Sequence, residues 1–225
     1  SRHDPLNVVG TIIINAAGFT GTPNVDECEI RKADTIKGSI VFPCLLEQFN
    51  VPIVHITSGC VYDGYKSGGW SVDDAPNFGA GNGSFYSTVK AIEQEMVPKD
   101  HNYLLRIRLP FGREDHPKNY LTKLKNYPRL IDVRNSLSCI DDVARAAVFF
   151  ATERPPFGIY NVCNSGDVST REVAGMMGVE KEWFTYEEFR KAVIAPRSNC
   201  TLSTDKLSKI MPVRGVQEAL REAIS

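Results

Sequence analysis

Gly83-Ser84-Phe85-Tyr86-Ser87-Thr88-Val89-Lys90, read together with the earlier run Ile53-Val54-His55-Ile56-Thr57-Ser58-Gly59-Cys60, decides the fold of this 225-residue chain. The earlier run is apolar for most of its length, which is typical of a strand buried in a parallel sheet. The later stretch opens a helical pattern, and the i, i+4 spacing of Tyr86 and Lys90 places both side chains on one helix face. The two stretches therefore predict a buried strand that ends at Ser58 and a helix that presents Tyr86 and Lys90.

The spacing of Tyr86 and Lys90 suggests acid catalysis. A phenol has an ordinary pKa of about 10, and a fixed positive charge beside it favours the phenolate. The Ser58 hydroxyl, at the end of its strand, would hold a carbonyl group. The alternative is a surface tyrosine and lysine on an ordinary helix. A second pair with the same spacing, Tyr62 and Lys66, lies among glycines and is predicted to be in a loop.

The order of the remaining elements predicts an α/β fold. Apolar runs predict strands over Val8–Asn15, Val51–Thr57 and Tyr103–Leu109, with a crossover helix over Asp26–Asn50 between the first two. Such β-α-β units are right-handed and parallel, and in these sheets the chemistry lies at the carboxyl ends of the strands. Further along, the pattern predicts a long loop over Asp63–Gly83, helices over Lys118–Tyr127, Ile140–Thr152 and Thr170–Met177, strands over Arg129–Val133 and Gly158–Cys163, and an amphipathic helix at the C-terminal end of Leu202–Ser225.

Composition excludes several functions. A net charge of −1 and a pI near 6.4 give no basic field, so we expect no nucleic-acid partner. No apolar run reaches about 18 residues and the first residues are not a signal peptide, so we expect no membrane partner and a cytoplasmic location. The six cysteines form no C-x-x-C pair and the four histidines lie far apart, so we predict reduced thiols and no metal site.

The order of several motifs carries a family resemblance. Asn15-Ala-Ala-Gly18 is followed by Thr57-Ser-Gly-Cys-Val-Tyr62, by Tyr86-x-x-x-Lys90 and by Arg106-Ile-Arg-Leu-Pro110. This order resembles the extended short-chain dehydrogenase/reductases. Within them it is most similar to the dTDP-4-dehydrorhamnose reductases, and closest to the epimerase/reductase half of plant rhamnose synthase. The likeness runs from about Thr11 to the C-terminus and includes Asn119-Tyr-Leu-Thr-Lys123 and Ala195-Pro-Arg-Ser-Asn199.

The resemblance implies an activity and a set of roles. It implies a Rossmann-like doubly wound parallel sheet with a small C-terminal substrate lobe, and reduction by NADPH or NADH of a nucleotide-linked 4-keto-6-deoxy sugar, with 3,5-epimerisation. Tyr86 would be the general acid, Lys90 its partner and ribose ligand, Ser58 the carbonyl holder, and Cys60 and Lys123 the epimerisation pair. The implied cofactor contacts are Asn15, Ala16, Ala17, Gly18, Tyr86, Lys90 and Leu109, and the implied substrate contacts are Thr20, Asn24, Ser84, Phe85, Asn119, Arg197 and Asn199.

Each role has an alternative that the sequence leaves open. Cys60 could be a small buried core residue, Lys123 a solvated helix lysine, and Arg197 a surface arginine after a proline turn. If strand geometry persists past Ser58, the side chains of Ser58 and Cys60 leave the same face and point at the same sugar. Simple reductases of the resembling family tend to carry a tyrosine where Cys60 stands, so this position favours a bifunctional enzyme. A non-catalytic regulatory protein on the same fold is the alternative function, and the choices between dTDP and UDP and between NADH and NADPH stay open.

The glycine turn that holds the cofactor pyrophosphate in such enzymes does not appear in the sequence. By the resemblance, a complete enzyme needs roughly 60 further residues upstream. We therefore expect a fragment, the ordered portion of a longer chain, or a naturally shortened protein. We divide the chain into residues 1–134, a partial NAD(P)-binding domain, and residues 135–225, a mixed region that includes the substrate lobe. A homodimer is left as an open alternative.

Overall fold

A four-stranded parallel sheet forms the centre of the molecule. The computed structural model describes residues 10–225, so Val8 and Val9 of the first predicted strand lie outside the described residues. The strand order is β1-β2-β3-β8, with bounds β1 Ile13–Asn15, β2 Ile53–Ser58, β3 Tyr103–Ile107 and β8 Gly158–Asn161. The four predicted strands of this sheet are present with different bounds: β1 begins only at Ile13, β2 runs from Ile53 to Ser58, and β3 and β8 each end two residues earlier than predicted. All three pairings are parallel.

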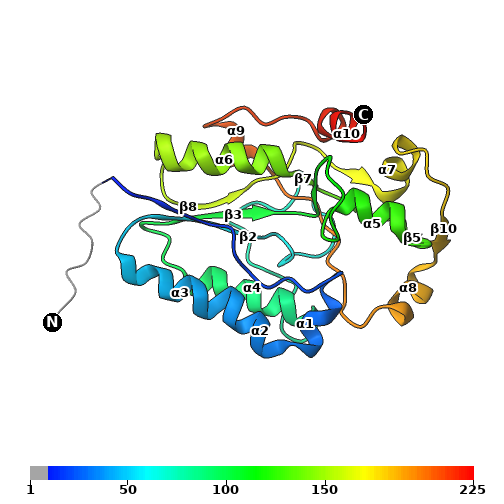
Figure 1. The fold of residues 1–225 in the computed structure, drawn as a ribbon, viewed down its shortest axis with the longest axis horizontal. Coiled ribbons are helices and arrows are strands. Elements are labelled where there is room, and N and C mark those ends of the chain that lie inside the picture. The colour runs from blue at the N-terminus through cyan, green and yellow to red at the C-terminus, as the bar shows by residue number, and fades with distance from the viewer. Residues whose placement is uncertain (1–9) are drawn as a thin grey trace.

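Helices cover both faces of this sheet (Figure 1). The helices α1 to α4 lie on one side, and α6 lies on the other together with α9 and α10. Helix α6 buries Ala146, Ala147 and Phe150 against the sheet residues Val54 and Leu105. Its apolar face recurs at helical spacing, which explains why the sequence predicts it well. The doubly wound α/β class is confirmed. The bounds are α4 Phe85–Met96, α6 Ile140–Glu153, α9 Asp205–Ser208 and α10 Val216–Ile224.

The predicted single crossover helix over Asp26–Asn50 is wrong in its continuity. Arg31, with φ −95° and ψ 56°, interrupts the helix after its first turn and a half. A π-helical turn follows α2 and contains Gly38. This glycine packs closely on the earlier segment around Phe19, because a Cβ atom on Gly38 would lie 2.7 Å from the Phe19 nitrogen. The run ends at Asn50 in the left-handed conformation. The segments are α1 Asp26–Ile30, α2 Lys32–Ile36, the π-helix Lys37–Val41, α3 Phe42–Leu46 and the 3₁₀ turn Glu47–Phe49.

Short elements gather at one end of the sheet (Figure 1). They surround a second core that includes Leu121, Leu130, Val173 and Leu220. Ser169 and Glu172 form a complete capping box, which confirms the predicted start of α7. These elements are α5 Tyr120–Asn126, α7 Thr170–Met176, α8 Tyr186–Ala192 and the two-stranded sheets β5–β10, β4–β7 and β6–β9, with β4 Pro110–Phe111, β5 Arg129–Ile131, β6 Arg134–Asn135, β7 Ser138–Cys139, β9 Val168–Ser169 and β10 Glu182–Phe184.

The long predicted loop is tied to the body of the molecule. The Trp70 nitrogen donates to the Thr201 carbonyl at 2.8 Å, and the Tyr62 hydroxyl donates to the Asp74 carbonyl at 2.7 Å. The rings of Tyr62 and Trp70 stack with centroids 5.2 Å apart. Strand β8 belongs to residues 135–225 and completes the central sheet. The central sheet therefore contains strands from both sides of the predicted boundary at residue 134.

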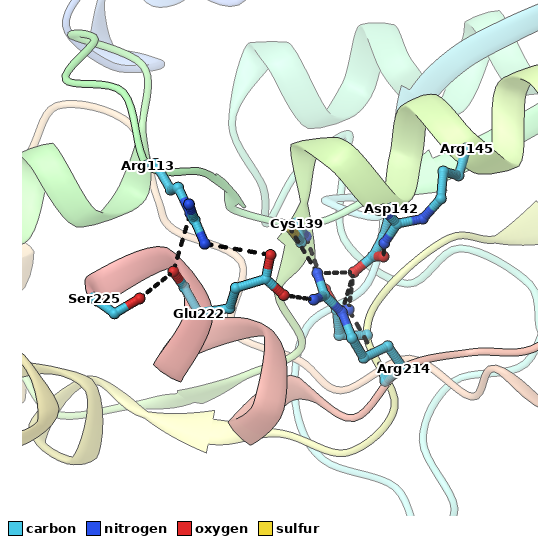
Figure 2. A network of polar contacts seen from close by, with 8 residues as sticks. Arg113, Cys139, Asp142, Arg145, Arg214, Glu222 and Ser225 are labelled. Atoms are coloured by element: carbon cyan, nitrogen blue, oxygen red, sulfur yellow. Dashed lines mark hydrogen bonds and ion pairs between the residues drawn. The ribbon is translucent and has the colours of Figure 1, made fainter.

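The C-terminal helix is held by a network of ion pairs (Figure 2). Arg214, with a side chain 17% exposed, donates to Asp142 of α6 at 3.0 Å and pairs with Glu222 of α10. The backbone carbonyl of Glu222 also accepts a hydrogen bond from the Arg113 side chain at 3.1 Å. Burial alone would raise the pKa of Asp142, but hydrogen bonds from Asn164 and Arg214 outweigh it and hold this pKa below its ordinary value of 3.8.

Replacing Arg214 should destabilise the fold in a pH-dependent way. Arg214→Ala leaves Asp142 without its main partner, so we expect the free energy of unfolding at pH 7 to fall by about 1–3 kcal/mol. The depressed pKa of Asp142 stabilises the protein above about pH 4, and this contribution is lost as the pH falls further. Urea unfolding should therefore show the difference from wild type narrowing below about pH 4. Arg145→Ala is the matched control, because Arg145 also pairs with Asp142 but is 61% exposed.

Candidate active site

The polar residues predicted from the motifs lie where the parallel strands end. Asn15 ends β1 and Ser58 ends β2, and the helix α4 begins next to them at Ser84. The Ser84 side chain accepts from the Ser87 nitrogen at 3.0 Å and caps the helix. Gln94 on α4 donates to the Ser58 carbonyl at 2.8 Å and so fixes the helix against the end of β2.

Tyr86 and Lys90 lie on the buried face of α4, with exposures of 7% and 3%. The Lys90 nitrogen lies 5.9 Å from the centre of the Tyr86 ring. It is also 2.7 Å from the carboxylate of Glu93, which is itself buried and accepts from the Thr57 hydroxyl at 2.9 Å. The lysine charge is thus shared between the tyrosine and a buried carboxylate that the sequence reasoning missed.

The predicted lowering of the Tyr86 pKa does not occur in this arrangement. Burial raises the pKa of Tyr86 well above its ordinary value, and the nearby Cys60 and Glu93 act in the same direction, whereas a hydrogen bond from Ser58 lowers it. Burial is the main reason, and Glu93 adds to it as a negative charge that also pairs with the ammonium predicted to favour the phenolate. Tyr86 is therefore held as a protonated phenol, which is the form that a proton donor needs.

The turn after β1 lies against this lysine. The Asn15 amide oxygen accepts from the Ala17 nitrogen at 3.1 Å, and its nitrogen lies 3.1 Å from Nδ1 of the buried His55. A Cβ atom at Gly18 would lie 4.0 Å from the Lys90 nitrogen, which places the turn next to the lysine. Ala17, Gly18 and neighbouring side chains line a hollow of about 360 Å³.

Leu109 follows the third strand with an uncommon backbone. Its φ is +37°, in the left-handed region that a bulky residue rarely adopts. Such strain clusters at functional sites, which agrees with the predicted place of Leu109 among the cofactor contacts.

Cys60 is placed by a turn. The strand ends at Ser58, so the expectation that Ser58 and Cys60 project from one strand face is wrong. Instead the Cys60 nitrogen donates to the Ser58 hydroxyl oxygen at 3.0 Å. Both side chains still act on Tyr86, since each shifts its pKa. Cys60 is therefore half-exposed at the site, which disfavours the alternative of a buried core residue.

Lys123 approaches the same site from α5. Burial and the positive charges of Arg197 and Lys118 lower the pKa of Lys123, and Cys60 opposes them. The lysine is half-buried, so it is not the fully solvated lysine of the alternative reading. A lowered pKa makes an ammonium group a better proton donor near neutral pH.

Arg197 is fixed next to α1. Its guanidinium donates to Asp26 at 2.7 Å, to the Ala195 carbonyl at 2.7 Å and to the Asn24 side chain at 3.3 Å. It is 21% exposed. Arg197 is therefore a partly buried, oriented cation and not a free surface arginine.

Other predicted substrate contacts are engaged within the fold. The Asn119 side chain caps α5 at the Leu121 nitrogen and donates to the carbonyls of Gly112 and Glu114, each at 2.7 Å. All its polar atoms are used, so it orients the helix that carries Lys123. The backbone nitrogen of Phe85 donates to the Glu29 carboxylate at 2.7 Å, and the backbone nitrogen of Asn199 donates to the Asp63 carboxylate at 2.7 Å. Thr20 is half-buried in the turn after Gly18.

Among residues 10–225, no group of three His, Cys, Asp or Glu side chains is placed to hold a metal ion. In the same range, no helix is long and apolar enough to cross a membrane.

Comparison with known proteins decides the family. No family model matches the chain. A bifunctional dTDP-4-dehydrorhamnose 3,5-epimerase/dTDP-4-dehydrorhamnose reductase of Arabidopsis thaliana is 34% identical over an alignment of 228 positions. The alignment covers 92% of this chain and 74% of the relative. The chain belongs to this epimerase/reductase family. A trifunctional UDP-glucose 4,6-dehydratase/UDP-4-keto-6-deoxy-D-glucose 3,5-epimerase/UDP-4-keto-L-rhamnose-reductase of the same plant is 33% identical over 97% of this chain, which spans only 35% of that relative.

One solved structure supports the same family, and a more distant one shows the same fold. The crystal structure of the L780 UDP-rhamnose synthase from Acanthamoeba polyphaga mimivirus has a TM-score of 0.87 and 26% identity, over 94% of this chain and 80% of that one. The dTDP-4-dehydrorhamnose reductase from Bacillus anthracis, solved in complex with NADP, shares the fold with a TM-score of 0.78 and 18% identity, over 94% of this chain and 79% of that one. These relatives are enzymes, so the alternative of a non-catalytic protein gains no support.

Proposed function

We propose that this epimerase/reductase family member reduces the 4-keto group of a nucleotide-linked 4-keto-6-deoxy sugar with NADPH or NADH, and also epimerises the sugar at C3 and C5. The observation that carries the proposal is the convergence of Ser58, Tyr86 and Cys60 at the carboxyl end of β2, with Lys90 and Lys123 beside them. The bifunctional relative of Arabidopsis thaliana supports the pairing of the two activities.

The residues present fit the nicotinamide end of such a cofactor. The Asn15–Gly18 turn lies against Lys90, and Leu109 holds a strained backbone after β3, the strand next to β2. Tyr86 and Lys90 would bind the ribose. Residues 10–225 contain no glycine turn between a sheet strand and a helix N-terminus that could hold the pyrophosphate. When bound, the cofactor supplies the hydride.

The reduction needs a proton at the carbonyl oxygen as it becomes an alkoxide. Tyr86 is a buried, protonated phenol, so it can donate this proton. Ser58 lies beside it and would orient the carbonyl through its hydroxyl. Lys90 then supplies positive charge to the phenolate that remains, once its pairing with Glu93 is shared with substrate or cofactor oxygens.

The epimerisation needs two groups that exchange a carbon-bound proton next to the ketone from opposite sides. Cys60 and Lys123 come from different elements, the turn after β2 and the helix α5, and influence each other electrostatically. We assign them these two roles.

Arg197 should govern affinity for the nucleotide sugar. A guanidinium fork matches phosphate oxygens better than an ammonium does, so we expect Arg197→Lys to raise KM for the nucleotide sugar by about 10-fold or more. The affinity for NADPH should not change, because Arg197 lies against α1 and Asn24, away from the Asn15–Gly18 turn. Steady-state kinetics and an NADPH titration measure the two effects. An unchanged KM would remove Arg197 from the substrate site.

We also propose a cytoplasmic location, which the six free cysteines support because thiols stay reduced there. It stays a prediction that the protein has no nucleic-acid or membrane partner and that the chain divides at residue 134. A homodimer stays an open alternative.

A further inference from the structure

Arg108, which follows the third strand, is a buried cation with an unusual set of partners. Its side chain is 1% exposed, and the salt bridges found among residues 10–225 include none to it. Its Nη1 atom donates to the Cys60 sulfur at 3.0 Å and to the Ser198 hydroxyl at 2.9 Å. Its Nη2 atom donates to the Asn135 side chain and to the Ser198 carbonyl, the latter at 3.1 Å.

A buried guanidinium without a carboxylate partner is costly unless other groups carry compensating charge. Burial opposes the charge on Arg108, and the neighbouring thiols of Cys200, Cys60 and Cys163 raise its pKa above the ordinary value. Burial raises the pKa of Cys163 and of Cys200, so these two stay neutral thiols. Cys60, which is half-exposed, is the sulfur to which the guanidinium donates directly. The cation is thus directed at a sulfur that a substrate can reach.

The turn between Ser58 and Cys60 is shaped to admit this arginine. A Cβ atom at Gly59 would lie 3.0 Å from the Arg108 Cδ atom and 2.5 Å from a Leu202 methyl group. Glycine therefore lets the arginine stem pass directly beneath the turn. Ser198, which receives two hydrogen bonds from Arg108, is the neighbour of Arg197 in the chain. The same guanidinium therefore joins the thiol to the segment proposed to bind the substrate diphosphate.

We propose that Arg108 is the positioning residue for the epimerisation, holding the Cys60 sulfur in place and stabilising its negative charge. This inference rests on the proposed epimerase function. The Cys60 thiolate takes the proton from the carbon next to the ketone, and the C–H electron pair moves into an enolate. The Lys123 ammonium then gives a proton to the opposite face of that carbon, and the enolate electrons form the new C–H bond. Cys60 is left as a thiol and Lys123 as an amine, and both regain their charge by proton exchange with water.

Arg108→Lys in the full-length protein separates this role from a general structural one. We expect the rate of deuterium incorporation at C3 and C5 in deuterium oxide to fall by about 10- to 100-fold, because a hydrogen bond from a charged group to the sulfur is lost. The rate of reduction of pre-epimerised substrate at saturating concentration should stay within about threefold of wild type, since the side-chain hydrogen bonds of Arg108 go to Cys60, Ser198 and Asn135 and not to Ser58 or Tyr86. Unchanged incorporation, or an equal loss of both activities in a folded variant, would overturn the proposal.

A second measurement needs no substrate. The Arg108 guanidinium donates to the Cys60 sulfur and orients it, so at one fixed pH iodoacetamide should alkylate Cys60 about 10-fold faster in the wild type than in Arg108→Lys. Cys44 on α3 is the internal control, and its alkylation rate should be the same in the two proteins. Equal alkylation rates of Cys60 in the two proteins would mean that the pairing with Arg108 has no chemical effect, and the proposal would fail. A faster reaction of Cys60 in the wild type without any deuterium incorporation would instead overturn the epimerase function.

Discussion

Tyr86→Phe should lower kcat for NADPH-dependent reduction by about 10²- to 10⁴-fold, the contribution expected of a general acid. The change removes only the hydroxyl, so the ring keeps its place on the buried face of α4 and its contact with Lys90. Binding of the sugar should change little, because the proton is transferred only in the reaction. Binding of NADPH should weaken by only a few-fold, since Lys90 still contacts the ribose when the Tyr86 hydroxyl is lost, and kcat is therefore compared at saturating NADPH. Stopped-flow measurement of NADPH oxidation at saturating substrate gives the rate.

Tyr62→Phe is the matched control for this prediction. Tyr62 has the same i+4 spacing to a lysine, Lys66, but its hydroxyl accepts from Arg106 at 2.8 Å and serves the fold. Lys66 pairs with Asp74 at 2.6 Å in the loop. We expect Tyr62→Phe to lower the melting temperature and to leave kcat within a few-fold of wild type. Normal turnover by Tyr86→Phe would remove the acid assignment.

Cys60→Ser and Lys123→Met should each stop epimerisation while sparing reduction. The hydroxyl of serine is a far weaker base than a thiolate, and methionine keeps the stem of Lys123 without a proton to give. We expect incorporation of deuterium at C3 and C5 to fall by at least about 100-fold, within the range that an acid or base contributes. Mass spectrometry of the sugar, recovered before NADPH is added, measures this.

Reduction of a substrate that is already epimerised provides the internal control. It should proceed at near the wild-type rate in both variants, because Tyr86 and Ser58 are unchanged. Cys44→Ser, on a helix outside the site, should affect neither step. Wild-type reduction without any incorporation would remove the epimerase assignment and leave the reductase.

Much of the architecture follows from local patterns. The strands of the central sheet are short apolar runs, and helices α6, α7 and α10 carry amphipathic periods or caps that the sequence displays directly. The local pattern gives no signal for the break at Arg31, where the guanidinium lies 4.8 Å from the centre of the Phe19 ring, a contact between two segments. The strand-based argument for Cys60 failed for a related reason: it extended a regular geometry past Ser58, where the serine side chain starts a turn.

The motifs located the site residues but not the charges around them. Glu93 lies three residues after Lys90 on the same helix, and that spacing is a signal that could have identified the pair. Arg108 gave a weaker signal, an arginine alternating with apolar residues next to a strand. Its partners Cys60, Asn135 and Ser198 lie 27 to 90 residues away in the chain, so only the folded structure brings them together.

The central claim is that one site both epimerises and reduces a 4-keto-6-deoxy sugar. The most direct test incubates the full-length protein with dTDP- or UDP-4-keto-6-deoxyglucose and NADPH in deuterium oxide, and analyses the product by mass spectrometry and NMR. We predict one NADPH consumed per sugar and a product with a rhamnose configuration that carries deuterium at C3 and C5. Folded protein that binds NADPH but oxidises none of it with either nucleotide sugar would contradict the account.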